Sequence, residues 1–290
     1  MRVAYLGPAG TFTEDALRDA AAGAELEPLP SPSVYEAIVA VPSGRADRAF
    51  VPFENSIEGA VRSTLDTLAF DADGVAIVGE HDFAIRHCLI ARTPLPLAEV
   101  EVVLSHPQAS AQCARFIRER LPDAELRAAA STAEAVRAVS ERDEPWAALG
   151  AASAAGLYGC AILENGVEDE PDNVTRFVWV APERVAPGGD GPWRTSFVFA
   201  ELGEDHPGAL VDALAAFSDR GVNLTRIESR PRRRGLGTYM FFCDCEGAAG
   251  DDAVGAAIDE LRGKAESVRV LGSYPVVTSG IPGGTERAKG

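Results

Sequence analysis

Positive charge is scarce in this chain of 290 residues. It has 27 Lys and Arg residues against 44 Asp and Glu residues, which gives a formal net charge of -17 at pH 7. Such a surface repels the phosphates of nucleic acids, so we exclude nucleic acid as a partner. A small anionic ligand is not excluded, because a local cluster of hydrogen-bond donors can outweigh the mean charge.

Long apolar runs are also missing. No stretch reaches 18 consecutive apolar residues, so we expect no membrane-spanning helix and no membrane partner. The opening sequence MRVAYLGPAG lacks the apolar core and the cleavage site of a secretory signal. We therefore expect a cytoplasmic protein.

Cysteine is rare, and the five cysteines form an odd count without the spacing of a disulfide framework. Cys88, Cys113 and Cys160 lie among apolar residues, so we expect buried thiols in a reducing compartment. Cys243 and Cys245 would share one face of a strand. No further ligands follow nearby, and we expect no metal site.

Short apolar segments alternate with helical patterns from the first residue onward. Because alternating strands and helices build mostly parallel sheets with helices on both faces, the predicted class is α/β. The expected strands include 2–6, 48–52, 100–105 and 146–150, and the expected helices include 13–22, 57–68, 107–120 and 131–141.

Two extended segments without helices, 75–91 and 172–180, interrupt this alternation. We interpret them as crossings between two lobes, which leave a cleft where a ligand can bind. The predicted catalytic region is 1–181, with a first lobe of about 1–78 and 160–181 and a second lobe of about 79–159.

The segment 182–193 is rich in Pro and Gly and is a predicted linker. Beyond it, the strand and helix patterns of 194–275 follow the order βαββαβ, which is typical of a ferredoxin-like unit. The polar, glycine-rich segment 276–290 is expected to be a flexible tail.

Four loops before expected helices carry more polar residues than a connection needs. Thr11 with Glu14, and Ser105 with Gln108, have the spacing of a capping box. Each loop alone is typical of a capped helix, but such loops gather at the carboxyl ends of parallel strands, where free N–H groups bind anions. No lysine follows the glycines, so a small carboxylate fits better than a nucleotide cofactor. The loops read GPAGTFTE, PFENSIEG, SHPQASAQ and GAASAAG.

Motifs along the chain resemble those of the prephenate dehydratase family in order and spacing. They are GPAGTFTEDAL, VPFENSIEGAV, SHPQASAQC and NVTRF. Further on, GALVDALAAF and NLTRIESRP resemble the regulatory ACT domain of the same family. The resemblance covers about 2–275, and the family usually has Ser at the position of Thr13. The chain begins directly at the first expected strand. We therefore expect the form of the enzyme without the chorismate mutase domain that some relatives carry.

The resemblance implies a lyase of phenylalanine biosynthesis that converts prephenate to phenylpyruvate, water and carbon dioxide without cofactor or metal. It also implies a two-lobed catalytic region like that of periplasmic binding proteins. The ACT domains would pair in a homodimer or homotetramer and bind phenylalanine as an allosteric feedback inhibitor. Two alternatives stay open, an arogenate dehydratase and a non-enzymatic amino-acid-binding sensor.

By the same resemblance, Thr175 is the catalytic threonine and donates a hydrogen bond to the leaving hydroxyl, with Asn55 as a second catalytic residue. Arg176 either holds a substrate carboxylate bidentately or braces the motif, because adjacent residues of a strand face opposite sides. From the pattern alone, a surface ion pair of Arg176 is equally open. His106 is either a general base or a capping or core residue, and the sequence does not decide between these roles. The role of Glu54 is equally undecided. The expected substrate contacts are Thr11, Thr13, Ser56, Gln108 and Phe177.

The expected phenylalanine site lies in the C-terminal unit. A helix start there offers free N–H groups to a carboxylate. The alternative is a capped helix beside a strand that leads into a solvated turn. The residues assigned by resemblance are Gly208, Ala209, Leu210, Asn223, Glu228, Ser229, Arg230 and Pro231.

Overall fold

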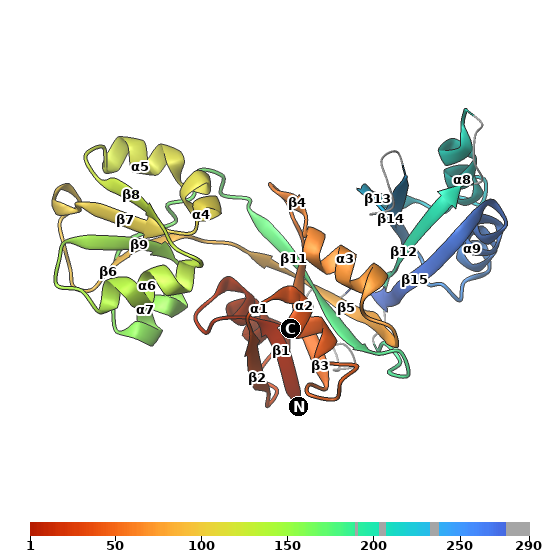
Figure 1. Ribbon diagram of the computed structural model, residues 1–290, viewed down its shortest axis with the longest axis horizontal. Helices are drawn as coiled ribbons and strands as arrows, with labels where there is room; N and C mark the ends of the chain where they lie inside the picture. Colours follow the sequence, from red (N-terminus) through yellow and green to blue (C-terminus); the bar gives the residue numbers. More distant parts are fainter. Residues whose placement is uncertain (189–190, 203–206, 233–237, 277–290) are drawn as a thin grey trace, which may run out of the picture.

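The computed structural model describes residues 1–188, 191–202, 207–232 and 238–276. It forms three bodies in a row, with the first lobe between the second lobe and the C-terminal domain (Figure 1). Within these ranges, every helix is too short or too polar to span a bilayer. The expected tail from residue 277 onward, and 189–190 of the expected linker, lie outside the described residues.

The first lobe is a mixed sheet with helices on both faces. Strands β1 and β2 are parallel, as are β1 and β3, whereas β11 runs antiparallel to both β3 and β5. Helix α1 packs on one face, and α2 and α3 pack on the other. The strands are β1 (Arg2–Leu6), β2 (Glu27–Ser31), β3 (Arg48–Asn55), β4 (Gly59–Ala60), β5 (Val75–Ala84) and β11 (Val174–Pro182); the helices are α1 (Phe12–Ala21), α2 (Val34–Val39) and α3 (Arg62–Phe70).

The second lobe is a five-stranded sheet in the order β10-β6-β9-β7-β8, also covered on both faces. Its strands are β6 (Cys88–Ala91), β7 (Val102–Ser105), β8 (Glu125–Ala128), β9 (Trp146–Gly150) and β10 (Ala161–Asn165). Its helices are the 3-10 turn Leu97–Glu99, α4 (Pro107–Gln112), α5 (Ala114–Arg120), α6 (Thr132–Ser140) and α7 (Ala152–Tyr158).

The lobes meet at residues later in the chain than the sequence indicates. Strand β5 stays paired with β11 as far as Ala84, so 79–84 belong to the first lobe rather than the second. Strand β10 pairs with β6, so 161–165 belong to the second lobe rather than the first. Backbone pairing between strands sets these limits of the lobes. The apolar pattern of the two crossing segments does not reveal which strands pair.

The C-terminal domain has the expected βαββαβ order. It comprises β12 (Trp193–Leu202), α8 (Ala209–Ser218), β13 (Leu224–Pro231), β14 (Tyr239–Glu246), α9 (Asp252–Lys264) and β15 (Ala265–Pro275). Helices α8 and α9 cover one face of its sheet, and the other face packs against the first lobe. Strand β15 lies beside β5, so one ten-stranded sheet runs through both bodies.

The burial of each cysteine depends on the helix, strand or turn in which it lies. Cys88 and Cys113 are buried as expected, but Cys160 is only half-buried because it lies in the turn between α7 and β10. Cys243 and Cys245 point into the core under the helices of the C-terminal domain. Burial raises the pKa of both thiols to about 12, so neither is a thiolate at neutral pH.

Candidate active site

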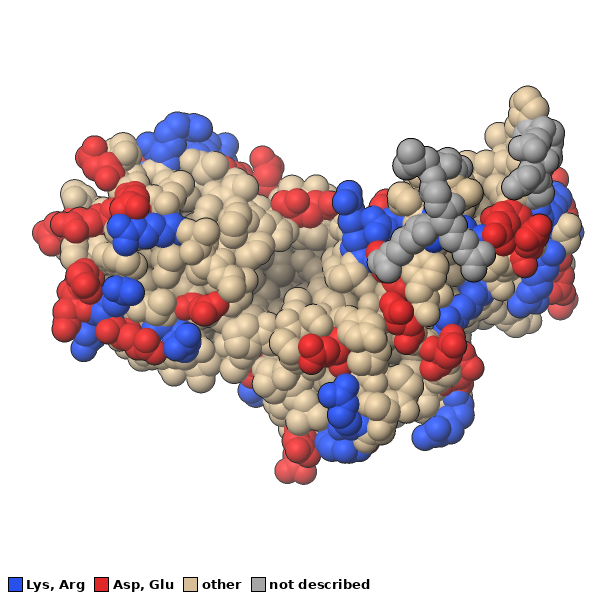
Figure 2. All heavy atoms as spheres, viewed as in Figure 1, with Lys and Arg blue, Asp and Glu red and all other residues tan. Residues whose placement is uncertain are grey.

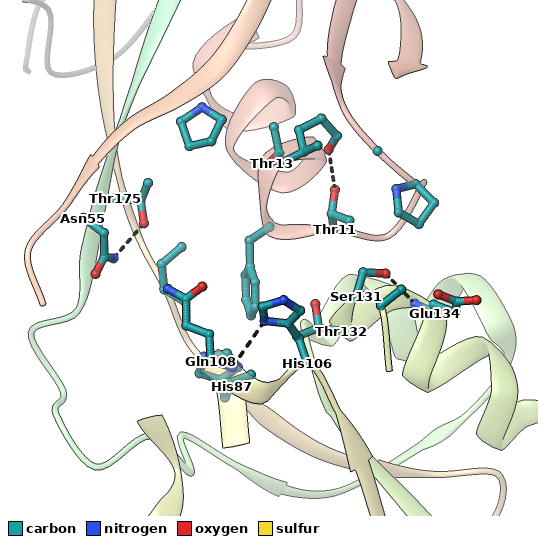
Figure 3. Close-up of a pocket in the computed structure, with 18 of the residues that line it drawn as sticks. Thr11, Thr13, Asn55, His87, His106, Gln108, Ser131, Thr132, Glu134 and Thr175 are labelled. Atoms are coloured by element: carbon teal, nitrogen blue, oxygen red, sulfur yellow. Dashed lines mark hydrogen bonds between the residues drawn. The ribbon is translucent and has the colours of Figure 1, made fainter. Parts of the chain in front are cut away.

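A cavity of about 720 Å³ lies between the two lobes. Six of the eight residues expected to act on a substrate line it, and Ser56 and Arg176 do not. Figure 3 shows polar side chains from both lobes around this common space. The six are Thr11, Thr13, Asn55, Gln108, Thr175 and Phe177.

The cavity contains almost no charge. Among the described residues that line it there is no Lys or Arg, and Glu134 is the single carboxylate. Figure 2 shows the hollow between the lobes as a surface without the blue and red of charged residues. An anion bound here would therefore be held by neutral donors and backbone dipoles.

Helices from both lobes begin at the cavity. In the first lobe, the Thr11 side chain caps α1 by accepting from the N–H of Glu14 (3.4 Å), and the Glu14 carboxylate accepts from the N–H of Gly10 (2.7 Å). In the second lobe, Ser131 caps α6 by accepting from the N–H of Glu134 (3.0 Å). The first N–H groups of both helices lack helical acceptors and carry partial positive charge.

The cap of α4 differs from the expectation. His106, not Ser105, is the capping residue, and its Nδ1 accepts from the N–H of Gln108 (3.3 Å). Ser105 is buried and donates to the carbonyl of Leu149 (3.0 Å), so it is not available as a cap. Because Nδ1 accepts, the neutral imidazole carries its proton on Nε2. His106 can thus donate a hydrogen bond within the cavity.

Asn55 and Thr175 face each other across paired strands β3 and β11. The Oδ1 atom of Asn55 accepts from the backbone N–H groups of Ile57 and Glu58, both at 3.0 Å, which fixes the orientation of the amide. Its Nδ2 must then donate to Thr175 Oγ1 (2.9 Å). Since that oxygen accepts from Asn55, the hydroxyl hydrogen of Thr175 is free to point into the cavity.

The hydrogen-bond chain continues through residues that the sequence analysis did not assign. Asn55 also donates to Asn173 Oδ1 (2.7 Å), and Asn173 donates to Gln112 Oε1 (3.2 Å). The same oxygen accepts from His87 Nε2 (3.1 Å). Burial lowers the pKa of His87, so this ring is neutral. One signal in the sequence was the Gln108 and Gln112 pair, four residues apart on one helix face.

Of the remaining expected contacts, Thr13, Thr11 and Phe177 line the cavity and Ser56 lies outside it. The hydroxyl of Thr13 has no hydrogen-bond partner in the described chain, so it can bind a ligand, whereas Thr11 donates to the carbonyl of Leu6 (3.2 Å). Phe177 stacks on Phe50 with ring centroids 5.1 Å apart and forms an apolar wall. Ser56 is exposed outside the cavity and accepts from the N–H of Val174 (3.0 Å), so it joins two chain segments.

Arg176 lies on the opposite face of β11 from Thr175 and outside the cavity. Its guanidinium binds carboxylates of Glu54, Glu80 and Asp244, at 2.8, 3.3 and 2.7 Å. A role as a clamp for a substrate carboxylate is therefore excluded in this arrangement, because strand alternation turns the side chain away. Of the roles that the sequence left open for Arg176, the one as a structural brace of the motif agrees with these contacts. The ion pairs are buried rather than on the surface, and Glu54 is one of the partners.

The residues of the expected phenylalanine site lie at the start of α8 and at the end of β13, except Asn223, which directly precedes β13. Gly208 caps α8 with a φ of 105°, a conformation that favours glycine. Arg230 already makes a two-point ion pair with Asp66 of α3, at 2.8 and 3.3 Å. Ser229 and Pro231 are exposed on the other face of β13. The assignment of these residues to phenylalanine remains a prediction.

The fold and the cavity define a two-lobed α/β protein with a neutral, donor-rich cleft and a C-terminal βαββαβ domain. The family model of prephenate dehydratase matches residues 3–185, and the model of the ACT domain matches residues 197–263. The chain belongs to the prephenate dehydratase family and is an enzyme of the lyase class. Both parts of the resemblance noted in the sequence are confirmed.

Curated relatives match almost the whole chain. The prephenate dehydratase of Mycobacterium marinum is 41% identical over 282 residues, which cover 94% of this chain and 88% of the relative. The prephenate dehydratase of Mycobacterium sp. strain JLS is 44% identical over 288 residues, with coverage of 96% and 90%.

Solved structures agree with this assignment. The prephenate dehydratase of Arthrobacter aurescens in complex with L-Phe has a TM-score of 0.87 at 39% identity, covering 95% of this chain and 90% of that one. The enzyme of Staphylococcus aureus has a TM-score of 0.78 at 26% identity, with coverage of 94% and 100%. A protein described as a quorum quenching acylase, GqqA, has a TM-score of 0.81 at 32% identity, with coverage of 96% and 98%.

Proposed function

We propose that this chain catalyses the decarboxylating dehydration of prephenate to phenylpyruvate, in the biosynthesis of phenylalanine in the cytoplasm. The observation that carries the proposal is the Thr175 hydroxyl, whose hydrogen is left free for the cavity by the Asn55 amide. Relatives that bear the name of this activity match the chain over nearly its whole length.

The reaction breaks two bonds of the substrate ring. The bond to the ring carboxylate breaks and leaves its electron pair in the ring, while the C–O bond opposite breaks with its pair on oxygen. A proton turns the departing hydroxide into water. A hydrogen bond from Thr175 lowers the barrier, because it strengthens as negative charge develops on that oxygen. The threonine hydroxyl is a very weak acid, so we assign it hydrogen bonding and assign proton delivery to solvent.

Neutral donors can hold the two carboxylates of prephenate. The first turn of α1 with Thr13 lies in one lobe, and the first turn of α6 with Gln108 and His106 lies in the other. A dianion spanning the cleft would therefore bind to both lobes at once. Phe12 and Phe177 supply apolar walls for the ring.

The absence of a cation from the described lining suits decarboxylation. The negative charge of the ring carboxylate disappears as carbon dioxide forms. An arginine paired with that carboxylate would stabilise the bound substrate more than the transition state and so would slow the step. Neutral donors stabilise the bound substrate less than an arginine would, so they slow the step less.

The decisive experiment is incubation of the purified full chain with prephenate and, separately, with arogenate, following the aromatic product by absorbance. We expect phenylpyruvate from prephenate. Arogenate carries an ammonium group, and Glu134 is the carboxylate in the lining that could accept it. If arogenate is the substrate, Glu134→Gln should reduce its turnover. Absence of product from both compounds would support the sensor alternative.

The likeness to an acylase does not lead to a second proposal. Attack on an acyl group needs a hydroxyl activated by a base. In the described structure, Thr175 Oγ1 accepts from an amide and has neither a histidine nor a carboxylate as its partner.

We further propose that phenylalanine inhibits the enzyme through paired ACT domains. The related Arthrobacter enzyme was crystallised with L-Phe, and β13 offers an exposed edge for pairing with a second copy. Light scattering with and without phenylalanine distinguishes a homodimer from a homotetramer. A monomer under both conditions would contradict this part of the proposal.

A further inference from the structure

The ACT domain and the first lobe share one hydrophobic core. Met240 and Phe242 of the domain lie in the same buried cluster as Leu65 of α3. At the junction of β15 and β5, a Cβ atom at Gly272 would lie 2.2 Å from the carbonyl oxygen of Ile77. The absence of a side chain at Gly272 thus allows the backbones to meet. We call this contact the seam.

Arg176 crosses the seam from the catalytic side. Its side chain is only 8% exposed, and one nitrogen contacts both Asp244 of the ACT domain (2.7 Å) and Glu54 of β3 (2.8 Å). The guanidinium lies over the ring of Phe53, 4.9 Å from its centroid. A flexible side chain is thereby held in one position by groups from both bodies.

Asp244 is held equally firmly from the ACT side. Its carboxylate is fully buried and accepts from Arg226 Nε (2.9 Å) and from the hydroxyl of Ser196 (2.7 Å). Separating a buried carboxylate from its partners is costly, because the charge cannot regain water. A movement of Asp244 therefore pulls on the Arg176 guanidinium.

The charged cluster lies directly behind the pair that faces the cavity. Thr175 is in register with Asn55, and Arg176 is in register with Glu54, on the same two strands. On the cavity side the pair is joined by an amide–hydroxyl hydrogen bond, and on the seam side by an ion pair. A displacement of β11 at Arg176 must also displace the hydroxyl of Thr175.

We infer that Arg176 and Asp244 form a positioning pair through which the ACT domain sets the place of Thr175 in the cavity. The inference rests on the proposed function, because it names the route by which phenylalanine on the ACT domain lowers turnover. Coupling between distant sites needs a packed element that both sites can bias, and this cluster contacts both bodies.

The test is Asp244→Asn in the full chain, which removes the charge and keeps the shape. We expect kcat for prephenate to fall about tenfold at unchanged KM, as a displaced reacting group would cause. The phenylalanine concentration for half-inhibition should shift by at least about fivefold. Arg176→Lys should act on the same two values, and the double variant should be less impaired than the two single effects combined.

The matched control is Asp73→Asn. Asp73 pairs with Arg269 (3.3 Å) and also joins the first lobe to the ACT domain, but no hydrogen bond or ion pair of the described chain links its side chain to β11 or to Asp244. We expect its kcat and its inhibition to match those of the wild type. A folded Asp244→Asn variant that behaves like this control would overturn the inference.

Hydrogen exchange of the unmodified chain gives a readout that does not depend on turnover or on the folding of a variant. We expect added phenylalanine to change exchange in peptides of β11 as well as in α8 and β13. A change confined to the ACT domain contradicts the coupling. Turnover of prephenate by the wild type tests the proposed function separately, so failure of one is distinguishable from failure of the other.

Discussion

Strand β11 presents two unlike surfaces at neighbouring residues. Thr175 faces a cavity whose described lining contains no Lys or Arg. Arg176 faces a buried cluster with three carboxylates and two further arginines, Arg194 and Arg226. The strand pleat alone separates these environments, because successive side chains point to opposite faces.

The contrast separates two uses of charge. In the cleft, a fixed cation would favour the bound substrate over a transition state that is losing its carboxylate. In the seam, buried opposite charges penalise any displacement that separates them. Under the proposed function, one pair of adjacent residues would therefore serve chemistry on one side and domain position on the other.

The largest expected effect is that of Thr175→Val, which keeps the shape of the side chain and removes the hydroxyl. We expect kcat to fall about 10²- to 10³-fold, the cost of losing one donor to the transition state. KM should change little, and Thr175→Ser should restore most of the rate. Steady-state kinetics with prephenate measures this; near-wild-type turnover of the valine variant would remove Thr175 from the mechanism.

The direction of the Asn55–Thr175 hydrogen bond can be reversed with Asn55→Asp. The introduced carboxylate still accepts from Ile57 and Glu58, but it cannot donate to Thr175, so the hydroxyl hydrogen turns toward that carboxylate rather than the cavity. We expect kcat to fall about tenfold to a hundredfold. A rate at saturating prephenate equal to that of the wild type would mean that the direction of this bond is irrelevant.

The seam should respond to pH through Glu80. Burial raises the pKa of Glu80 to about 7, and Arg176 opposes this rise. The folded state thus binds the proton more tightly than the unfolded state, so this contribution to stability is complete below about pH 4.5 and is lost as the pH rises through about 7.

Glu80→Gln removes that titration. Between about pH 5 and 8, the unfolding free energy of the wild type should fall relative to the variant by on the order of 2 kcal/mol. Urea unfolding of both proteins at several pH values measures the difference. Parallel curves would show that Glu80 keeps its ordinary pKa in the seam.

The smallest expected effect is that of Ser56→Ala, outside both the cavity and the seam. Losing the contact with Val174 should cost less than about 1 kcal/mol of stability and leave kcat and KM within about twofold of the wild type. Thermal unfolding and steady-state kinetics measure both. A large rise of KM would restore Ser56 as a substrate contact.

Sequence patterns were sufficient for the layers, and the family resemblance supplied much of the cleft. Periodicity predicted the βαββαβ order, and the resemblance implied that Thr11, Asn55 and Gln108 share one site with Thr175; all four line one cavity. Alternation in the strand also showed that Arg176 and Thr175 cannot face the same ligand without a turn.

Long-range partners were beyond that reasoning. A pattern indicates which face of a strand is covered but not which segment covers it, so Asp244, the partner of Arg176, could not be found. The cap at α4 was missed for a related reason. Leu149, distant in sequence, accepts from Ser105, and this left His106 as the cap. Both cases required the tertiary arrangement of strands.

The most direct test is a crystal structure of the full-length Thr175→Val variant with prephenate bound. We expect the ring hydroxyl of prephenate to lie within hydrogen-bond reach of position 175. We also expect the carboxylates to lie at the first turns of α1 and α6, and Arg176 to stay paired with Asp244. A substrate carboxylate bound to the guanidinium of Arg176, with its ion pair to Asp244 broken, would contradict the separation of the two faces.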